Sequence, residues 1–422
     1  MFRVFRAPRW LLALWVVQAG TVLVFLSFAG ALPLIKSEWG LSNAQAGVIQ
    51  AATQAGYITA VLVLSSVTDY LPMRRLLPAC ALWAGLANLG FALLARDMTS
   101  AIVWRALTGM GVAGIYMPGV RLISERVSAE RRGGSVGVFV SAFTLGSAAS
   151  IALGGSLSTA LGWRTAFALL SAGPIVGALV VSRALPGMPP KLNPLPAAEA
   201  SPSIAEVLRN RPALLAIGAY TAHTWEVLGL RSWLPAFLAT ALMLAGRGLH
   251  AATAVGAGLA GAATLTGAVA TAAVGALSDR AGRSLTIIMV ASVSLILMLS
   301  MGFVLGVPLI LVVSVAIIVA VAANADSAVI STTLTENVPS RYLGRALAMY
   351  SFCGFSAGTL SPILFGVALD YLNPSRASGS AALPVRWEGA FGVLALGSLA
   401  ALAAAVALHR TLRRSDPCAV LS

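Results

Sequence analysis

Charged residues are scarce in this 422-residue sequence: they make up 10% of it, whereas hydrophobic residues make up 58%. Soluble globular proteins carry about 25% charged residues, and so few charges cannot cover the surface of a soluble chain of this length. The composition therefore indicates a polytopic membrane protein. The basic excess, 28 Lys and Arg against 14 Asp and Glu, lies at the ends of apolar runs. It indicates membrane topology rather than a nucleic-acid partner.

Residues suited to metal, redox or nucleotide chemistry are also few. The three cysteines, Cys80, Cys353 and Cys418, are far apart and match no metal or redox spacing. The chain has no G-x-x-x-x-G-K-[ST] motif, which excludes an ATPase of its own. A membrane enzyme would need clustered nucleophiles or acid–base groups at one interface, and the sequence has no such cluster. We therefore expect a protein that is not an enzyme and that holds no metal or cofactor.

Twelve apolar stretches are long enough to cross a bilayer, which takes about 20 helical residues. The first follows three arginines and runs for about 26 residues, which is too long for the apolar core of a signal peptide. The predicted spans are roughly residues 10–35, 46–67, 76–95, 100–123, 135–160, 164–184, 211–238, 251–277, 284–304, 307–335, 346–371 and 389–409.

Lysine and arginine divide unevenly between the two ends of these spans. With the N-terminus inside, the inner segments hold 19 of the 28 and the outer segments hold six. Cytoplasmic loops carry the excess of Lys and Arg in membrane proteins. We therefore expect both termini on the cytoplasmic side of a multi-pass protein in the cytoplasmic (inner) membrane.

A Pro-rich segment near the middle of the chain, LPGMPPKLNPLP, cannot continue a helix. A shift of 210 residues places Asp69 on Asp279 and Gly134 on Gly344. Such an internal repeat is typical of secondary transporters. We predict an N-terminal six-helix bundle over residues 1–184, a cytoplasmic central loop over 185–210, and a C-terminal six-helix bundle with a short cytoplasmic tail over 211–422.

The short loop GALSDRAGR resembles the signature loop of the major facilitator superfamily, and Gly282 can adopt a positive φ in this tight turn. The matching residues are Gly275, Leu277, Asp279, Arg280, Gly282 and Arg283. The first-half copy keeps Asp69, Arg74 and Arg75 but lacks both glycines. The resemblance covers the whole chain. It implies an all-α fold of twelve transmembrane helices in two pseudo-symmetric bundles, gated by these loops, and the subgroup is loosely similar to cyanate and nitrate permeases.

The fourth predicted span contains RALTGMG, which resembles the superfamily's R-x-x-x-G-x-G pattern through Arg105, Gly109 and Gly111. The resemblance implies a role for Arg105 in proton coupling. The alternative is an arginine that snorkels to the outer interface. The fifth span has glycines like those of the family's export motif but lacks the Gly-Pro pair, which weakens the case for drug export.

The seventh predicted span, YTAHTWEVLGLRSWLPAFL, carries His223, Glu226 and Arg231 within an apolar run. An ionised carboxylate in hydrocarbon must pair, face water or take up a proton. A group that takes up a proton in this way is what proton coupling requires, so these three residues are proton-coupling or cavity candidates. A structural pair between Glu226 and either Arg231 or Arg105 remains an alternative.

The tenth span adds Asn324 and Asp326, and Asp326 is either a cavity residue that binds substrate or proton, or a helix–helix anchor. Further cavity candidates are Gln18, Gln54, Tyr57 and Tyr220. At the predicted inner ends we expect a charge network that locks one state, although solvated loop charges are the alternative. Its members are Glu125, Arg131, Glu336, Arg341 and Arg345, with Asp279 and Arg283 as partners.

The sequence therefore favours a secondary transporter that works by alternating access, with protons as the coupling ion. Interior arginines favour uptake of a small, anionic metabolite. Proton-driven efflux of drugs or metabolites is the alternative, and a non-transporting membrane scaffold or receptor is a remote one. We expect a monomer whose partners are a small-molecule substrate, protons and the lipid bilayer.

Overall fold

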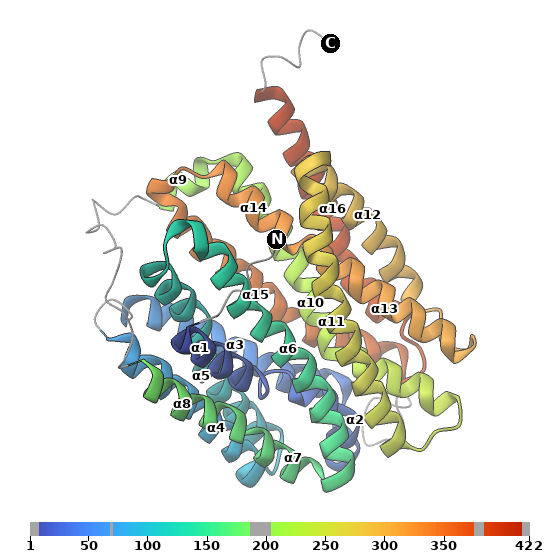
Figure 1. Ribbon diagram of the computed structural model, residues 1–422. Helices are drawn as coiled ribbons and strands as arrows, with labels where there is room; N and C mark the ends of the chain where they lie inside the picture. The colour runs from blue at the N-terminus through green and yellow to red at the C-terminus, as the bar shows by residue number, and fades with distance from the viewer. Residues whose placement is uncertain (1–7, 68–70, 186–203, 375–383, 416–422) are drawn as a thin grey trace, which may run out of the picture. The chain divides into compact units, whose positions relative to one another are not determined.

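The computed structural model describes residues 8–67, 71–185, 204–374 and 384–415. Within these ranges α-helix is the dominant regular structure, and the sole β feature is an isolated bridge between Leu305 and Val307 (Figure 1). The helices are α1 (Arg9–Val22), α2 (Ser27–Trp39), α3 (Asn43–Val67), α4 (Met73–Leu94), α5 (Met98–Arg126), α6 (Ala129–Leu161), α7 (Trp163–Leu170), α8 (Ala172–Ala184), α9 (Ile204–Arg209), α10 (Arg211–Leu244), α11 (Leu249–Ala281), α12 (Arg283–Met301), α13 (Leu309–Ala325), α14 (Ser327–Asn337), α15 (Ser340–Leu372) and α16 (Glu388–Ser415).

Twelve helical segments of the described chain are long and apolar enough to span a membrane, which confirms the predicted number. Three of them are built from two helices each: α1 with α2, α7 with α8, and α13 with α14. The first span runs from Arg9 to Trp39, and its interruption at residues 23–26 lies near its middle. This interruption contains no proline or glycine, so the sequence pattern did not predict it.

Helix ends follow local capping chemistry. Asp97 accepts hydrogen bonds from the backbone N–H and the hydroxyl of Ser100, which starts α5. These hydrogen bonds, the backbone one first, hold the pKa of the Asp97 carboxyl below its ordinary value. Asn210 accepts from the Ala213 N–H and, with a proline in the first turn, starts α10. Gly282, at φ 90°, ends α11 and starts α12, which confirms the positive φ expected of the loop.

The chain divides into two compact units. Unit 1 comprises residues 1–35, 52–197 and 253–261, and unit 2 comprises residues 36–51, 198–252 and 262–422. Most of the predicted central loop lies outside the described residues, and the predicted boundaries at 184 and 211 stay predictions.

Unit 1 has its apolar core among α1, α4, α5 and α8. Small residues bring its helices close together: a Cβ placed on Gly109 of α5 would lie 1.8 Å from the Thr53 carbonyl oxygen of α3. Likewise, a Cβ on Gly111 would lie 2.5 Å from the Ala84 nitrogen of α4. Lipid tails are as apolar as side chains, so close van der Waals packing of this kind is a main source of helix association in a membrane.

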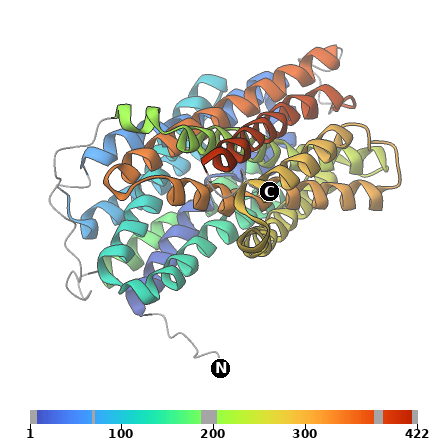
Figure 2. The same cartoon turned by 90° about the horizontal axis from the view of Figure 1, so that it is seen from above.

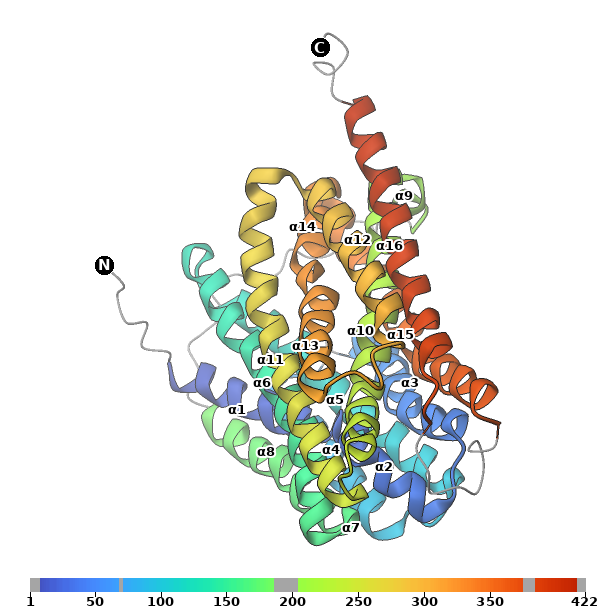
Figure 3. The ribbon, with the colours of Figure 1, turned by 90° about the vertical axis from the view of Figure 1, so that its right-hand side faces the viewer.

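Unit 2 is organised around α10, the most buried of the twelve spans. Helix α10 packs against α15 and α16, α15 runs alongside α16 (Figure 2), and α16 lies beside α12 (Figure 3). An aromatic cluster fills the space among α10, α15 and α16, and edge-to-face pairs within it are worth about 0.5–1.5 kcal/mol each. Its members are Trp233, Phe237, Phe365, Trp387 and Phe391.

Replacing Gly109 with alanine should destabilise the protein, because the new methyl group would meet the backbone of α3 rather than a movable side chain. Overpacking of this kind costs about 1–3 kcal/mol or more. The matched control is Gly137→Ala in α6, where an added Cβ meets nothing within 4 Å. Thermal unfolding of the purified protein in detergent checks the pair, and equal melting temperatures would contradict the close approach.

Candidate substrate and proton site

Helix α10 positions the three polar residues that the sequence singled out. His223, Glu226 and Arg231 lie on this one helix, yet their partners lie on two sides of it. His223 and Arg231 are paired with residues of α13 or its junction with α14, whereas Glu226 is turned towards α12 and α16. The three candidates therefore fall into two locations.

The first location is a histidine–aspartate pair. His223 Nδ1 lies 2.8 Å from an Asp326 carboxylate oxygen, and both side chains are more than nine-tenths buried. Asp326 is the residue at which α13 ends and α14 begins. The interruption frees backbone groups, and the Thr271 and Ser327 hydroxyls donate to the freed Asn324 carbonyl. The broken span thus places a carboxylate inside the helix bundle.

Next to this pair, Arg231 donates a hydrogen bond of 2.6 Å to the amide oxygen of Asn324. The Asn324 amide nitrogen in turn donates to the Ala320 carbonyl oxygen, which fixes the orientation of the side chain. The Arg231 Nε is buried and has no hydrogen-bond partner among the described residues. The partner that the structure gives this guanidinium is therefore a neutral amide, which leaves its charge uncompensated at short range.

Aromatic rings flank the histidine. Tyr220 stacks on Tyr350 of α15, with ring centroids 3.5 Å apart, and on His223 at 6.0 Å. The Tyr350 hydroxyl shares a 2.6 Å hydrogen bond with Ser331 of α14. Sequence reasoning named Tyr220 but missed Tyr350 and Ser331. Tyr350 is a polar-tipped ring within an apolar span, and that was the one signal available.

The second location surrounds Glu226, which is 4% exposed. Its two carboxyl oxygens accept hydrogen bonds from Ser294 of α12 and Ser398 of α16, the latter at 2.8 Å. Both serines are buried as well. The structure thus gives Glu226 hydroxyl partners, in place of the ion pair with Arg231 or Arg105 that the sequence left open. Two hydroxyl donors compensate part of the cost of burying a carboxyl group.

In unit 1, Arg105 reaches the interruption of the first span. Its guanidinium donates to the carbonyl oxygens of Val24 and Phe25, at 3.0 and 2.8 Å, and to Asn88 at 3.3 Å. The side chain is fully buried, so it does not snorkel to an interface, and its guanidinium lies over the rings of Phe91 and Phe167, 5.7 and 6.0 Å from their centroids.

Among the unit 1 cavity candidates, Gln18 and Gln54 are 1% exposed, and both amide atoms of Gln54 have no hydrogen-bond partner within the described chain. The Tyr57 ring lies 6.1 Å from Phe25.

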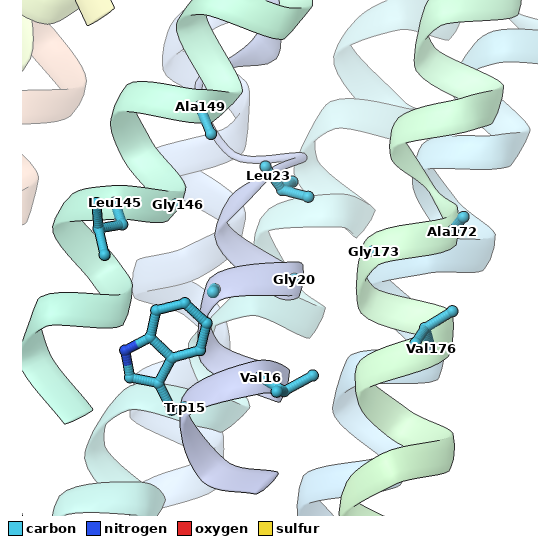
Figure 4. A pocket seen from close by; sticks show the side chains of 11 residues that line it. Trp15, Val16, Gly20, Leu23, Leu145, Gly146, Ala149, Ala172, Gly173 and Val176 are labelled. Carbon is cyan, nitrogen blue, oxygen red and sulfur yellow. The ribbon is translucent and has the colours of Figure 1, made fainter. Parts of the chain in front are cut away.

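A cavity of about 460 Å³ also lies in unit 1, between α1, α6 and α8 (Figure 4). Its walls include Trp15, Leu145, Val176 and several glycines and alanines. None of the residues predicted to bind substrate or proton lines it.

The charged residues of the signature loop form a cluster within unit 2. Arg283 of α12 pairs with Asp279 of α11 across the turn at Gly282, and with Glu336 of α14 at 3.0 Å. Glu125 instead pairs with Arg121 at 3.1 Å, and Arg341 with Glu206 at 3.4 Å. The expected inner network is thus distributed over separate pairs. Arg74, Arg75, Arg131 and Arg280 are exposed, Gly275 and Arg345 are half-buried, and Asp69 lies outside the described residues.

Twelve apolar spans within the described chain, three of them interrupted, and buried titratable groups facing one another across helices are the features of a polytopic membrane transport protein. A model of the Major Facilitator Superfamily matches residues 14–362, and the chain belongs to this family. It is therefore a transporter and not an enzyme.

Solved structures share the fold. The crystal structure of a bacterial homolog of the human lysosomal transporter Spinster matches with a TM-score of 0.77 and 17% identity, over 96% of each chain. That of a D-xylose–proton symporter matches with a TM-score of 0.72 and 16% identity, over 94% of this chain and 96% of the other.

Curated relatives match over shorter stretches. The transporter YgaY of Escherichia coli O157:H7 is 32% identical over 159 residues, which is 37% of this chain and 39% of that protein. The benzoate transport protein of Acinetobacter baylyi is 24% identical over 163 residues, 37% of this chain and 34% of that protein. The matched stretches thus span less than two fifths of these relatives.

Removing one hydroxyl from the Glu226 location should lower stability. Ser398→Ala deletes the donor to one carboxyl oxygen, and a hydrogen bond to a charged group is worth about 1.5–3 kcal/mol, against about 0.5–1.5 for a neutral one. Ser147→Ala is the matched control, because the Ser147 hydroxyl is buried without a hydrogen-bond partner. The melting temperatures of the two serine variants measure the loss. A double-mutant cycle of Ser398→Ala with Glu226→Gln then isolates the interaction between these two side chains. A drop as small as that of the control would show that the serine does not support Glu226.

Proposed function

We propose that this protein takes up small organic acids, with aromatic carboxylates foremost, together with protons across the cytoplasmic membrane. The observation that carries the proposal is Arg231: its side chain is half-buried, its Nε is buried, and its hydrogen-bond partner is the neutral Asn324 amide. A guanidinium binds a carboxylate through two parallel hydrogen bonds. Its unused Nε–H and its positive charge fit the anionic group of such a substrate.

The rings of Tyr220 and Tyr350 support an aromatic substrate. They stack on each other and, through Tyr220, on His223, so that aromatic rings lie in the same unit as Arg231. Offset stacking between aromatic rings contributes about 0.5–1.5 kcal/mol beyond the area buried. The match to a benzoate transport protein supports the same substrate class.

Charge balance supplies a physical link between substrate and proton. Without substrate, the positive charge of Arg231 and the negative charge of Asp326 offset each other in a region of low dielectric constant. A carboxylate bound to Arg231 leaves an excess negative charge, and a proton on the His223–Asp326 pair restores neutrality. Anion and proton thus bind better together than apart, which is the requirement for symport. The fold shared with a proton symporter is consistent with this link.

The other candidate residues support the site without binding the substrate in this proposal. Arg105 stabilises the interruption of the first span by binding the freed carbonyl groups. Glu226, which is hydrogen-bonded to two serines and lies within electrostatic reach of His223 and Asp326, is a second group that can hold a proton. The Arg283 cluster braces the helix ends of α11, α12 and α14. The topology with both termini inside follows from the distribution of arginine.

Arg231→Gln should abolish high-affinity uptake. Losing two hydrogen bonds to a charged group, each worth about 1.5–3 kcal/mol, should raise KM for benzoate by roughly 100-fold or more. Proteoliposomes with an acidic exterior and radiolabelled benzoate measure it. Arg211→Gln, at an exposed position on the same helix, is the control. Uptake by the Arg231 variant at the wild-type rate would refute the site. Net outward movement of benzoate by the wild-type protein would instead favour efflux.

Asp326→Asn should abolish proton-driven accumulation of benzoate while leaving the exchange of benzoate across the membrane intact. Without a titratable carboxyl the variant should keep exchange of internal for external benzoate, but a pH gradient should no longer drive net uptake. Gradient-driven accumulation at the wild-type level would contradict the role of the His223–Asp326 pair. In the same assay Glu226→Gln tests the second carboxyl: unchanged proton movement per substrate would eliminate Glu226 as a proton carrier.

A further inference from the structure

The start of α3 is held by a residue far away in the sequence. The Asp370 carboxylate, on the last turn of α15, accepts hydrogen bonds from the Asn43 N–H at 3.0 Å, the Asn43 side-chain amide at 2.7 Å and the Ala44 N–H at 2.8 Å. Both segments belong to unit 2. A negative charge at a helix N-terminus meets unpaired N–H groups and the positive end of the helix dipole.

The remaining N–H groups of this helix end are satisfied locally. Ser42 and Gln45 form a reciprocal capping box, in which the Ser42 hydroxyl accepts from the Gln45 N–H and the Gln45 side chain accepts from the Ser42 N–H. The Ala46 N–H bonds to the Ser42 carbonyl. The first two N–H groups therefore depend on Asp370 alone, while the next two depend on their own segment.

Two glycines let the same helices cross in backbone contact. A Cβ on Gly366 of α15 would lie 2.3 Å from the Asn43 carbonyl oxygen, and a Cβ on Gly47 of α3 would lie 2.4 Å from that of Pro362. Gly47 and Gly366 are each four residues from the hydrogen-bonding Asn43 and Asp370, so they lie on the same helix faces. The hydrogen bonds and the close approach form one continuous contact, which we name the 43–370 latch.

The latch lies at the end of the spans predicted to face outward. Counting spans from the N-terminus places the loops after the first, third and eleventh spans on the same side, and the arginine distribution predicts that this side is outside. Directly behind the latch on α3 lies Gln50, which is 2% exposed and whose side-chain oxygen has no hydrogen-bond partner in the described part of the chain. It lies on the same stripe as Asn43 and Gly47, about 10 Å further along the helix.

We propose that the 43–370 latch is the outer gate of this transporter, and that Asp370 is the residue that holds it shut. Opening exchanges the three hydrogen bonds to Asp370 for hydrogen bonds to water. A carboxylate and a helix end are both readily hydrated, so the exchange is reversible, whereas the two glycines ensure a close fit on return. Asp370 acts as a positioning residue and does not contact the substrate.

The test is accessibility of a cysteine behind the latch in the full-length protein. In a background without Cys80, Cys353 and Cys418, Gln50→Cys reports on the gate and Ser147→Cys, in the core of unit 1, reports on general unfolding. A membrane-impermeant maleimide is applied from each side of the membrane. Asp370→Asn should raise labelling of Gln50→Cys from the outer side at least fivefold and leave Ser147→Cys unlabelled. Because no substrate is present, this result does not depend on the proposed organic-acid uptake.

Asp97→Asn is the matched control, since Asp97 also caps a helix on that side but bonds within its own segment. It should leave labelling of Gln50→Cys unchanged. Three results overturn the proposal: labelling of Gln50→Cys that does not respond to Asp370→Asn, an equal rise with Asp97→Asn, or labelling of both reporters, which would mean that Asp370 only stabilises the fold.

Discussion

Everything in this structure depends on one constraint: a polar group inside a membrane must find its partner within the protein, because hydrocarbon offers none. Where the first span is interrupted, Ser150 hydrogen-bonds the Leu23 carbonyl and the Leu26 N–H, while Arg105 takes the two carbonyls between them. Where the tenth span is interrupted, the Thr271 and Ser327 hydroxyls donate hydrogen bonds to the Asn324 carbonyl. At both interruptions, side chains from other helices meet the irregular backbone.

The two units use this constraint differently. In unit 1 the interior cation, Arg105, donates to two backbone carbonyls and to Asn88, so both of its terminal nitrogens serve the fold, and only its Nε has no partner in the described chain. In unit 2 Arg231 is bound to a single neutral amide, and Asp326, two residues from that asparagine, is paired with His223. The capacity for a solute and a proton therefore lies on α10 and its partners. The family resemblance instead predicted a proton-coupling role for Arg105, which lies in unit 1.

The length and composition of the apolar runs predicted the features that depend on the local sequence alone. Apolar runs gave all twelve spans, and the glycine of the signature loop gave the positive φ at Gly282. The interruption at residues 23–26 carries no helix breaker, because its cause lies on α5 and α6, more than 80 residues away. The serine partners of Glu226 and the stacking of Tyr350 on Tyr220 likewise depend on which helices are neighbours. A single sequence names polar residues but not the faces on which they meet.

Asp326 unites two properties in one residue, since it is both the ionisable partner of His223 and the joint between α13 and α14. Aspartate is a poorer helix former than glutamate and competes with the backbone through its short side chain. A change from Asp326 to glutamate would preserve the charge but favour one continuous helix, moving the carboxylate and closing the joint at once. Both the negative charge and the break in the helix therefore restrict this position. A substitution that keeps the charge does not keep the backbone conformation.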